Sequence, residues 1–363
     1  SNGAAGSNGA AGSNGAAGVG VKVAGIYATI VNSGTIRGGS GWDAQSSQGN
    51  AIQVSALGSR IINSGTIAAG SGASTAVLYQ AGANNAQFEM QNGSTITGNV
   101  DARAINSATL VVGTGAQTQG TFNVSDIGTQ YLGFNSFVKE GASNTLTLTG
   151  SNSGVTPWTI NEGVLAISND NQLGASSNAL TFGSKAGNTG TLKVNNSTLS
   201  SRNIVLLDNG SINVASAQTY RNSAVVSGAF DLTKQGDGTL TLAGANAYTG
   251  ATNVTSGTLA LADVGSIAQS SQVVLSSGSS ALDISGTTSG ATVNNLSGVA
   301  GAQVALGSQT LAVNSNADTT YAGAISGSGG LTKNGNSTLT LKGLAAYTGA
   351  TNVTSGTLAL ADV

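Results

Sequence analysis

The 363-residue sequence contains no histidine and no cysteine. The lack of histidine excludes a serine–histidine–aspartate catalytic site and any histidine-ligated metal site. The lack of cysteine excludes disulfides, thiolate metal sites and a cysteine nucleophile. A GxSxG-like context for a serine hydrolase is also missing. These absences remove the commonest nucleophilic and metal-dependent enzymes from consideration.

Charged residues make up only 7% of the chain, and the net charge is −2. The twelve Lys and Arg are scattered singly, so no basic stripe is available to neutralise nucleic-acid phosphates. The fourteen acidic residues are dispersed as well, whereas polysaccharide hydrolases need carboxylates that converge on one bond. Asp231 and Asp237 are the nearest acidic pair in the repeat described below. We expect both in solvated loops, because Gly330 and Asn336 replace them in the next copy.

Proline occurs once, aromatic residues make up 4%, and no apolar run approaches the roughly 20 residues of a membrane helix. Disordered chains usually carry high net charge or abundant proline, and this chain has neither. Its 55 glycines, with many Ala, Ser, Thr and Asn, suit narrow coils with small side chains on tight corners. We therefore expect one elongated body rather than several compact domains.

The most informative feature present is an internal duplication. Leu232–Val264 reads LTKQGDGTLTLAGANAYTGATNVTSGTLALADV, and Leu331–Val363 reads LTKNGNSTLTLKGLAAYTGATNVTSGTLALADV. A weaker copy, NTLTLTGSNSGVTPWTINEGVLAIS, starts at Asn144. Repeats at a fixed spacing indicate an architecture built by stacking one unit on the next.

Within the unit, apolar residues alternate with polar ones at a period of two. Leu240 and Leu242 fall on one side of the backbone, and Thr239 and Thr241 on the other, as in a half-buried strand. Such strands cannot bury their apolar face alone, so stacked copies are expected to form an all-β solenoid, with roughly 14 coils at about 25 residues each. An antiparallel sandwich has similar strand spacing. The in-register repeat and the lack of distinct NG or DG hairpin punctuation between the strands favour the solenoid.

The residues expected to hold the repeat together are its inward-facing and corner positions. Lys234, Lys333 and Lys139 are the recurring charge, which we expect to snorkel over the strand start rather than bind a ligand. We expect the tyrosine rings to pack over a loop, with their hydroxyls bonded to backbone. The full set of repeat positions is Leu232, Lys234, Leu240, Leu242, Tyr248, Val254, Gly257, Leu259, Leu331, Lys333, Leu339, Leu341, Tyr347, Val353, Gly356 and Leu358.

A second family of repeats precedes the first. IVNSGTI (Ile30–Ile36) recurs as IINSGTI (Ile61–Ile67) and, more loosely, as MQNGSTI (Met90–Ile96), each with apolar residues on both sides of a polar corner. The insert after the first copy contains Trp42 and Asp43, where a tryptophan that caps the solenoid is the simpler expectation and a partner-binding residue the alternative.

The sequence ISGSGGLTKNGNSTLTLKGLAAYTGATNVTSGTLAL (Ile325–Leu360) resembles the passenger-associated transport repeat of bacterial autotransporters. The weaker copy departs from it, with Gly154 in place of the tyrosine and Pro157 in place of an alanine. The resemblance implies a right-handed parallel β-helix that is exported to the cell surface, with C-terminal repeats that fold first. It predicts a linker at residues 1–18 and one β-helix over residues 19–363, with NSGTI-type turns in 19–136 and transport repeats in 137–363.

The same resemblance implies a function without catalysis or cofactors. Adhesion to a host-cell surface or extracellular matrix, or self-association, is expected, with the parent's outer-membrane β-barrel as a further partner and no nucleic acid. We find no signal peptide and no barrel pattern, and so expect an excised passenger fragment. Two alternatives stay open: a pure transport scaffold for an effector elsewhere, and a polysaccharide-active β-helix enzyme.

Overall fold

The computed structural model describes residues 18–39 and 49–361, and nearly all their regular structure is β-strand. Two 3-10 helices, η1 (Val124–Asp126) and η2 (Asp170–Leu173), are the exceptions among these residues. The strands stack in parallel as a β-solenoid of about 14 turns, which confirms the fold expected from the sequence. Trp42, Asp43 and most of the expected linker lie outside the described residues. No described helix has the length and apolarity required to cross a membrane.

The chain divides into two compact units, Ser1–Thr159 with Gln172–Ala175, and Ile160–Asn171 with Ser176–Val363. In the first unit each strand pairs with the equivalent strand of the next turn. One sheet contains β1 (Val21–Val23), β4 (Ile52–Val54), β7 (Thr75–Tyr79), β10 (Asn99–Asp101) and β13 (Tyr131–Leu132). Another set of paired strands contains β2 (Thr29–Asn32), β5 (Arg60–Asn63), β8 (Ala86–Gln91), β11 (Ala108–Thr114) and β14 (Ser136–Lys139). A third contains β3 (Thr35–Arg37), β6 (Thr66–Ala68) and β9 (Thr95–Thr97). In a fourth, β12 (Gln119–Asn123) pairs with β15 (Thr145–Thr149). β16 (Trp158–Ile160) carries residues of both units.

The NSGTI corners of the first unit are closed by buried asparagines. Asn32 Nδ2 donates to Asn63 Oδ1 at 2.7 Å, and Asn63 Nδ2 donates to the carbonyl oxygen of Gly65 at 3.0 Å. In the third, looser copy Met90 lies opposite Asn63. The amide ladder therefore ends there, which explains why that copy departs from the other two.

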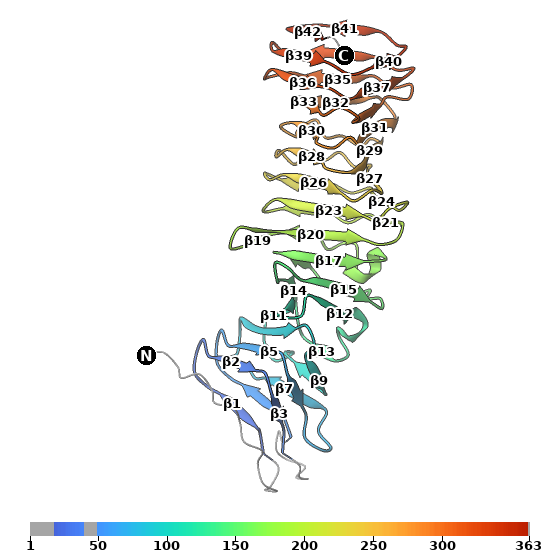
Figure 1. The fold of residues 1–363 in the computed structure, drawn as a ribbon. Coiled ribbons are helices and arrows are strands. Elements are labelled where there is room, and N and C mark those ends of the chain that lie inside the picture. The colour runs from blue at the N-terminus through green and yellow to red at the C-terminus, as the bar shows by residue number, and fades with distance from the viewer. Residues whose placement is uncertain (1–17, 40–48, 362–363) are drawn as a thin grey trace. The chain divides into compact units, whose positions relative to one another are not determined.

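In the second unit the strands of successive turns lie one above the next (Figure 1). The longest sheet contains β17 (Gly163–Ile167), β20 (Asn188–Val194), β23 (Gly210–Val214), β26 (Leu232–Gln235), β28 (Thr252–Val254), β30 (Val273–Leu275), β33 (Leu296–Gly298), β36 (Thr319–Tyr321), β39 (Thr338–Leu341) and β42 (Thr357–Leu360). A second contains β21 (Thr198–Ser200), β24 (Thr219–Asn222), β27 (Thr239–Leu242), β29 (Gly257–Asp263), β31 (Ser280–Thr287), β34 (Gln303–Ala305), β37 (Ala324–Gly327) and β40 (Ala345–Tyr347).

Two further groups of paired strands complete this unit. They contain β18 (Leu180–Phe182), β22 (Ile204–Leu206) and β25 (Val226–Gly228), and β32 (Ala291–Asn294), β35 (Leu311–Asn314), β38 (Leu331–Asn334) and β41 (Thr351–Val353). β19 (Ser184–Lys185) forms an antiparallel hairpin with β20. The core is a set of inward ladders in which equivalent side chains stack from turn to turn, for example Leu192 on Ile212. Each rung shelters its neighbours from water, so no single turn is stable alone.

Candidate functional site

The duplicated segment is two consecutive turns of the solenoid. β26 and β27 form one turn, and β28 and β29 form the next. β26 pairs with β28, and β27 pairs with β29, so that Leu240 lies on Leu259 and Leu242 on Leu261. All four leucines are buried, as their alternation with threonine and alanine predicts. The unit of sequence is therefore a pair of stacked turns.

Lys234 lies inside this pair and not at its surface. Its side chain is 1% exposed, and its ammonium donates to the carbonyl oxygens of Gln235 at 2.8 Å, Gly236 at 2.6 Å and Ser256 at 3.1 Å. The first two belong to the end of β26 and to the corner that follows it, and the third belongs to the corner of the next turn. The prediction of a snorkelling lysine is wrong, because the three N–H donors find three inward carbonyls and need no water.

The last copy repeats this arrangement. Lys333 is fully buried, and its Nζ donates to the carbonyl oxygens of Asn334 at 2.8 Å, Gly335 at 2.8 Å and Ser355 at 3.3 Å. The same atoms of the repeat are therefore joined in both copies, although residues around the corner differ between them.

The weaker copy keeps the lysine as well. Lys139 is fully buried opposite Val112, and its Nζ donates to the carbonyl oxygens of Glu140 at 2.5 Å and Gly141 at 3.3 Å. All three lysines thus donate to the carbonyl oxygens of the two residues that follow them, in agreement with the match proposed from the sequence.

Burial lowers the pKa of two of these lysines. It lowers the pKa of Lys234 to about 8, and the carboxylate of Asp237 partly opposes this shift. Burial also lowers the pKa of Lys333, against the opposing charge of Asp318. The direction is the expected one for an ammonium that is removed from water.

Tyr248 begins a chain of buried hydroxyl groups. Its hydroxyl lies 2.6 Å from Thr252 Oγ1, which donates to Ser270 Oγ at 2.8 Å, and Ser270 Oγ in turn donates to the carbonyl oxygen of Gly250 at 2.9 Å. Tyr248 therefore donates to a threonine and not to backbone, which corrects the expectation from sequence. Burial raises the pKa of Tyr248. Tyr347 and its threonine partner repeat the 2.6 Å contact in a more exposed setting.

Glycine is required where the second turn of the repeat passes its corner. Gly257 has φ +66°, and a Cβ there would lie 2.4 Å from the carbonyl oxygen of Gly236. Gly356 has φ +69°, with the equivalent distance 2.3 Å from the oxygen of Gly335. A side chain at either position would meet both a disfavoured φ and a backbone clash.

The predicted repeat residues differ in exposure between the two copies. All of the predicted residues are buried in the first full copy and in the first turn of the last copy. They are Leu232, Lys234, Leu240, Leu242, Tyr248, Val254, Gly257, Leu259, Leu331, Lys333, Leu339 and Leu341. In the second turn of the last copy Tyr347 and Leu358 are half-buried, and Val353 and Gly356 are exposed. The sequences are the same, so the difference arises because no described turn packs on β41 and β42.

The acidic pair of the repeat does not form a site. Asp231 is half-buried and accepts a hydrogen bond from the amide of Ala251 at 2.7 Å, whereas Asp237 is exposed. Over the described residues, no group of three or more acidic side chains is placed to bind a metal ion.

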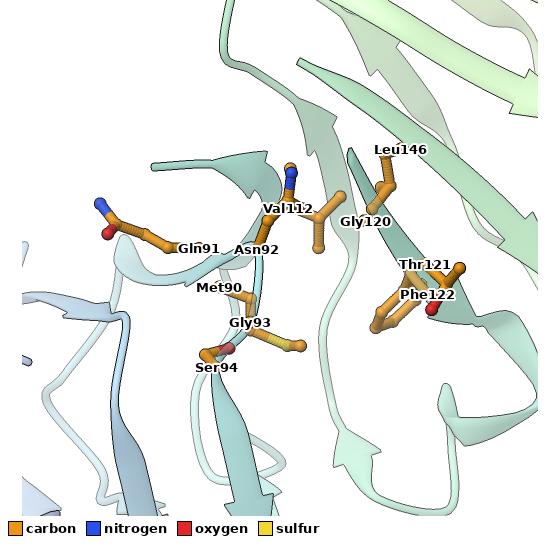
Figure 2. Close-up of a pocket in the computed structure, with 11 residues that line it drawn as sticks. Met90, Gln91, Asn92, Gly93, Ser94, Val112, Gly120, Thr121, Phe122 and Leu146 are labelled. Atoms are coloured by element: carbon orange, nitrogen blue, oxygen red, sulfur yellow. The ribbon is translucent and has the colours of Figure 1, made fainter. Parts of the chain in front are cut away.

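Two hollows among the described residues are small or open. Figure 2 shows one in the first unit, about 50 Å³ in volume, between Met90, Asn92, Phe122 and Leu146. Ligand pockets usually measure about 300–1,000 Å³, so this cavity has room for little more than water. A more open hollow of about 310 Å³ in the second unit has Asp263 as its one acidic lining residue. Neither brings two carboxylates together.

The sequence analysis missed a buried ion pair and an amide ladder in the second unit. Arg202 is 1% exposed and binds Asp170, with Nη2 and Oδ2 3.1 Å apart. Asn294, Asn314 and Asn334 stack with Nδ2–Oδ1 distances of 3.2 Å. The asparagines recur at the ends of three paired strands, a signal that a search for turn-to-turn register would have found.

Three segments match the passenger-associated-transport-repeat family: residues 137–167, 232–261 and 331–360. They coincide with the three lysine corners. The adhesin BmaC autotransporter of Brucella suis biovar 1 (strain 1330) is 38% identical to this chain over 200 residues. The chain carries the transport repeats of an autotransporter passenger. The resemblance inferred from the sequence is confirmed, and the repeats place this passenger at the bacterial cell surface.

The alignment covers 51% of this passenger and 6% of the relative. The passenger therefore matches a small part of a much longer protein. No solved structure matches it.

Proposed function

We propose that this passenger acts as a non-catalytic surface stalk, which mediates adhesion to host cells or extracellular matrix, or binds other copies of itself. The relative of B. suis is named an adhesin, which supports this reading. The dispersed acidic residues of the described structure favour it over a polysaccharide-active enzyme. We further propose that residues 19–136 and 137–363 work as parts of one β-helix, with the NSGTI turns presented for contact.

The observation that carries the adhesive part is a column of small side chains on the outer face of the longest sheet. These residues pair in register from β17 to β33, none is charged, and all but one are half-exposed. They are Val164, Thr191, Ser211, Thr233, Asn253, Val274 and Ser297. Hydroxyl and amide groups both donate and accept, so such a column is suited to many weak contacts made in parallel. Affinity would then come from multivalency.

Beads coated with the purified chain test this proposal. We expect them to aggregate or to bind host cells, and we expect Thr233→Lys with Asn253→Lys to reduce this, because lysines on the column face water and repel like charges. The matched control is Thr239→Lys with Thr258→Lys, which adds the same charge to the same two turns on another sheet. If coated beads neither aggregate nor bind cells, and the chain stays monomeric at every concentration, the passenger is a transport scaffold instead.

We also propose that the transport repeats assist secretion and folding of the parent through its outer-membrane β-barrel. The buried two-turn packing of the repeats supports this role, since stacking of one turn on the next releases free energy as the chain emerges. Deletion of residues 331–363 in the parent is expected to reduce the amount of folded passenger at the surface. Unchanged surface display after this deletion would remove the transport role.

A further inference from the structure

We propose that the buried lysine makes each transport repeat a two-turn cooperative unit: its ammonium holds the corner of one turn against the corner of the next, so that both turns form and open together. This assigns Lys234 and Lys333 as positioning residues, and it deepens the proposed role of the repeats in folding, on which its biological meaning rests.

The first argument is the unequal supply of hydrogen bonds along a turn. Strand carbonyls are satisfied by the next turn's amides, whereas corner carbonyls that point inward need another donor. Lys234 supplies all three donors at one corner: two for its own turn, at Gln235 and Gly236, and one for the next, at Ser256. A single ammonium therefore joins the corners of two turns, because Lys234 and Ser256 are 22 residues apart in the sequence.

The second argument comes from the position of the two full copies in the solenoid. In the first full copy, β26 belongs to the longest sheet and β27 to the sheet that runs from β21 to β40. In the last copy, β38 belongs to the sheet that runs from β32 to β41, and β39 belongs to the longest sheet. The repeat thus occupies different faces in its two copies. The lysine–carbonyl cluster is nevertheless the same in both, with Lys333 reaching Ser355 as Lys234 reaches Ser256. What the repeat preserves is the corner and not the face.

The third argument is that the stem of the lysine belongs to the apolar ladder. Lys234 lies between Ile212 and Val254 in register, so its methylene groups fill the position that an aliphatic residue takes in neighbouring turns. Only the terminal nitrogen differs from such a residue. Methionine in its place keeps the apolar stem and removes the three donors, which isolates the part played by the ammonium.

Other corners of the same solenoid use shorter donors across turns. Asn144 Nδ2 donates to the carbonyl oxygens of Gly113 and Gly115, both at 3.0 Å, and Asn294 Nδ2 donates to those of Ala268 at 2.9 Å and Ser270 at 2.7 Å. Inward donors that tie successive corners are therefore a general device of this fold. The lysine is the inward donor that recurs in all three transport repeats.

Hydrogen exchange on the purified chain tests the proposal with Lys234→Met and the control Lys193→Met. Lys193 points outward on β20, in the same sheet, so its substitution removes the same charge without touching a corner. In the wild type, amides of β26 to β29 should exchange through one common opening. In Lys234→Met we expect exchange of residues 255–259 to accelerate at least about tenfold and to separate from that of β26, since each buried carbonyl left without a donor is costly. Equal exchange in Lys234→Met and Lys193→Met would overturn the proposal.

A second pair of variants covers the case in which Lys234→Met does not fold. Lys333→Met and Lys342→Met remove one charge each from the same repeat, but Lys342 is exposed. We expect faster exchange of residues 354–358 in Lys333→Met alone, and no difference between the two would count against the positioning role. Hydrogen exchange is independent of bead aggregation and of secretion. The proposed adhesive and transport roles can therefore fail while the two-turn unit is supported, and the two-turn unit can fail while those roles are supported.

Chemical rescue separates the ammonium from simple packing. Lys234→Ala leaves a channel shaped like the lost side chain, and n-butylammonium is expected to restore slow exchange there, whereas n-butanol is not. Equal rescue by the two compounds would show that the stem and not the charged donor group holds the turns together.

Discussion

Lys234 Nζ and the carbonyl oxygen of Ser256 lie 3.1 Å apart, although the two residues belong to consecutive turns. The contact lies in the interior, between corners that no strand pairing joins. It gives the transport repeat a physical definition: a pair of stacked turns whose corners share one ammonium group.

The first prediction concerns pH. The pKa of Lys234 is about 8 in the fold and 10.5 in an exposed lysine, so between these values the unfolded chain binds more protons than the folded one. The free energy of unfolding contributed by this group should therefore rise as the pH increases from about 8 to 10.5. Chemical denaturation should show a steeper rise in the wild type than in Lys234→Met, in which Lys333 still contributes a rise of the same sign. Parallel pH profiles would contradict it.

The second prediction compares two tyrosines with the same partner. Tyr248→Phe should lower the free energy of unfolding by about 1–2 kcal/mol, because Thr252 loses its donor in a buried site. Tyr347→Phe should change it by less than about 0.5 kcal/mol, since water can replace the hydroxyl there. Thermal unfolding measures both, and a larger loss at Tyr347 would show that burial does not set the strength of this bond.

The third prediction uses equivalent leucines in different surroundings. Leu261 is 1% exposed and Leu360 is 77% exposed. Leu261→Ala should cost about 2–5 kcal/mol, because it leaves a cavity in a packed ladder. Leu360→Ala should cost less than about 0.5 kcal/mol. Urea denaturation is the measurement, and similar costs would mean that these residues have the same environment in solution.

The fourth prediction concerns the amide ladder of the first unit. Asn63 is fully buried, and its Nδ2 faces the carbonyl oxygen of Gly65. Asn63→Asp replaces that donor with a carboxylate oxygen and should cost at least about 1–3 kcal/mol. Asn213→Asp, on an outward position of the second unit, is the control and should be nearly neutral. Circular dichroism on heating would compare them, and an unchanged midpoint for Asn63→Asp would exclude the ladder as a stabilising element.

The strands of this passenger were predictable because their signal is local. In TLTL the alternation of Leu240 and Leu242 with threonine requires one apolar face, and the sequence duplication indicates an architecture in which such faces are buried by stacking. Both facts are visible within a few residues or by comparison of two segments. The particular partners of these leucines, Leu259 and Leu261, are known only from the structure.

The interior position of the lysine was not predictable in this way. A lysine at a strand end is expected to reach water. Whether it meets carbonyls instead depends on which corner the next turn places above it, here at Ser256. The hydrogen bond of Tyr248 was missed for the same reason. Its partner Thr252 is near in the sequence, but Thr252 donates its own proton to Ser270, which lies in another turn.

Amino-acid order alone thus specifies a stack of parallel strands, the positions of its corners and the kinship with autotransporter passengers, because alternation and repetition are properties of the chain itself. The folded arrangement decides how the corners are satisfied, which face each repeat occupies and which of two identical leucines is buried. These depend on what lies one turn away, at a separation of some twenty residues, and hydrogen bonding and burial act across that gap in space and not along the chain.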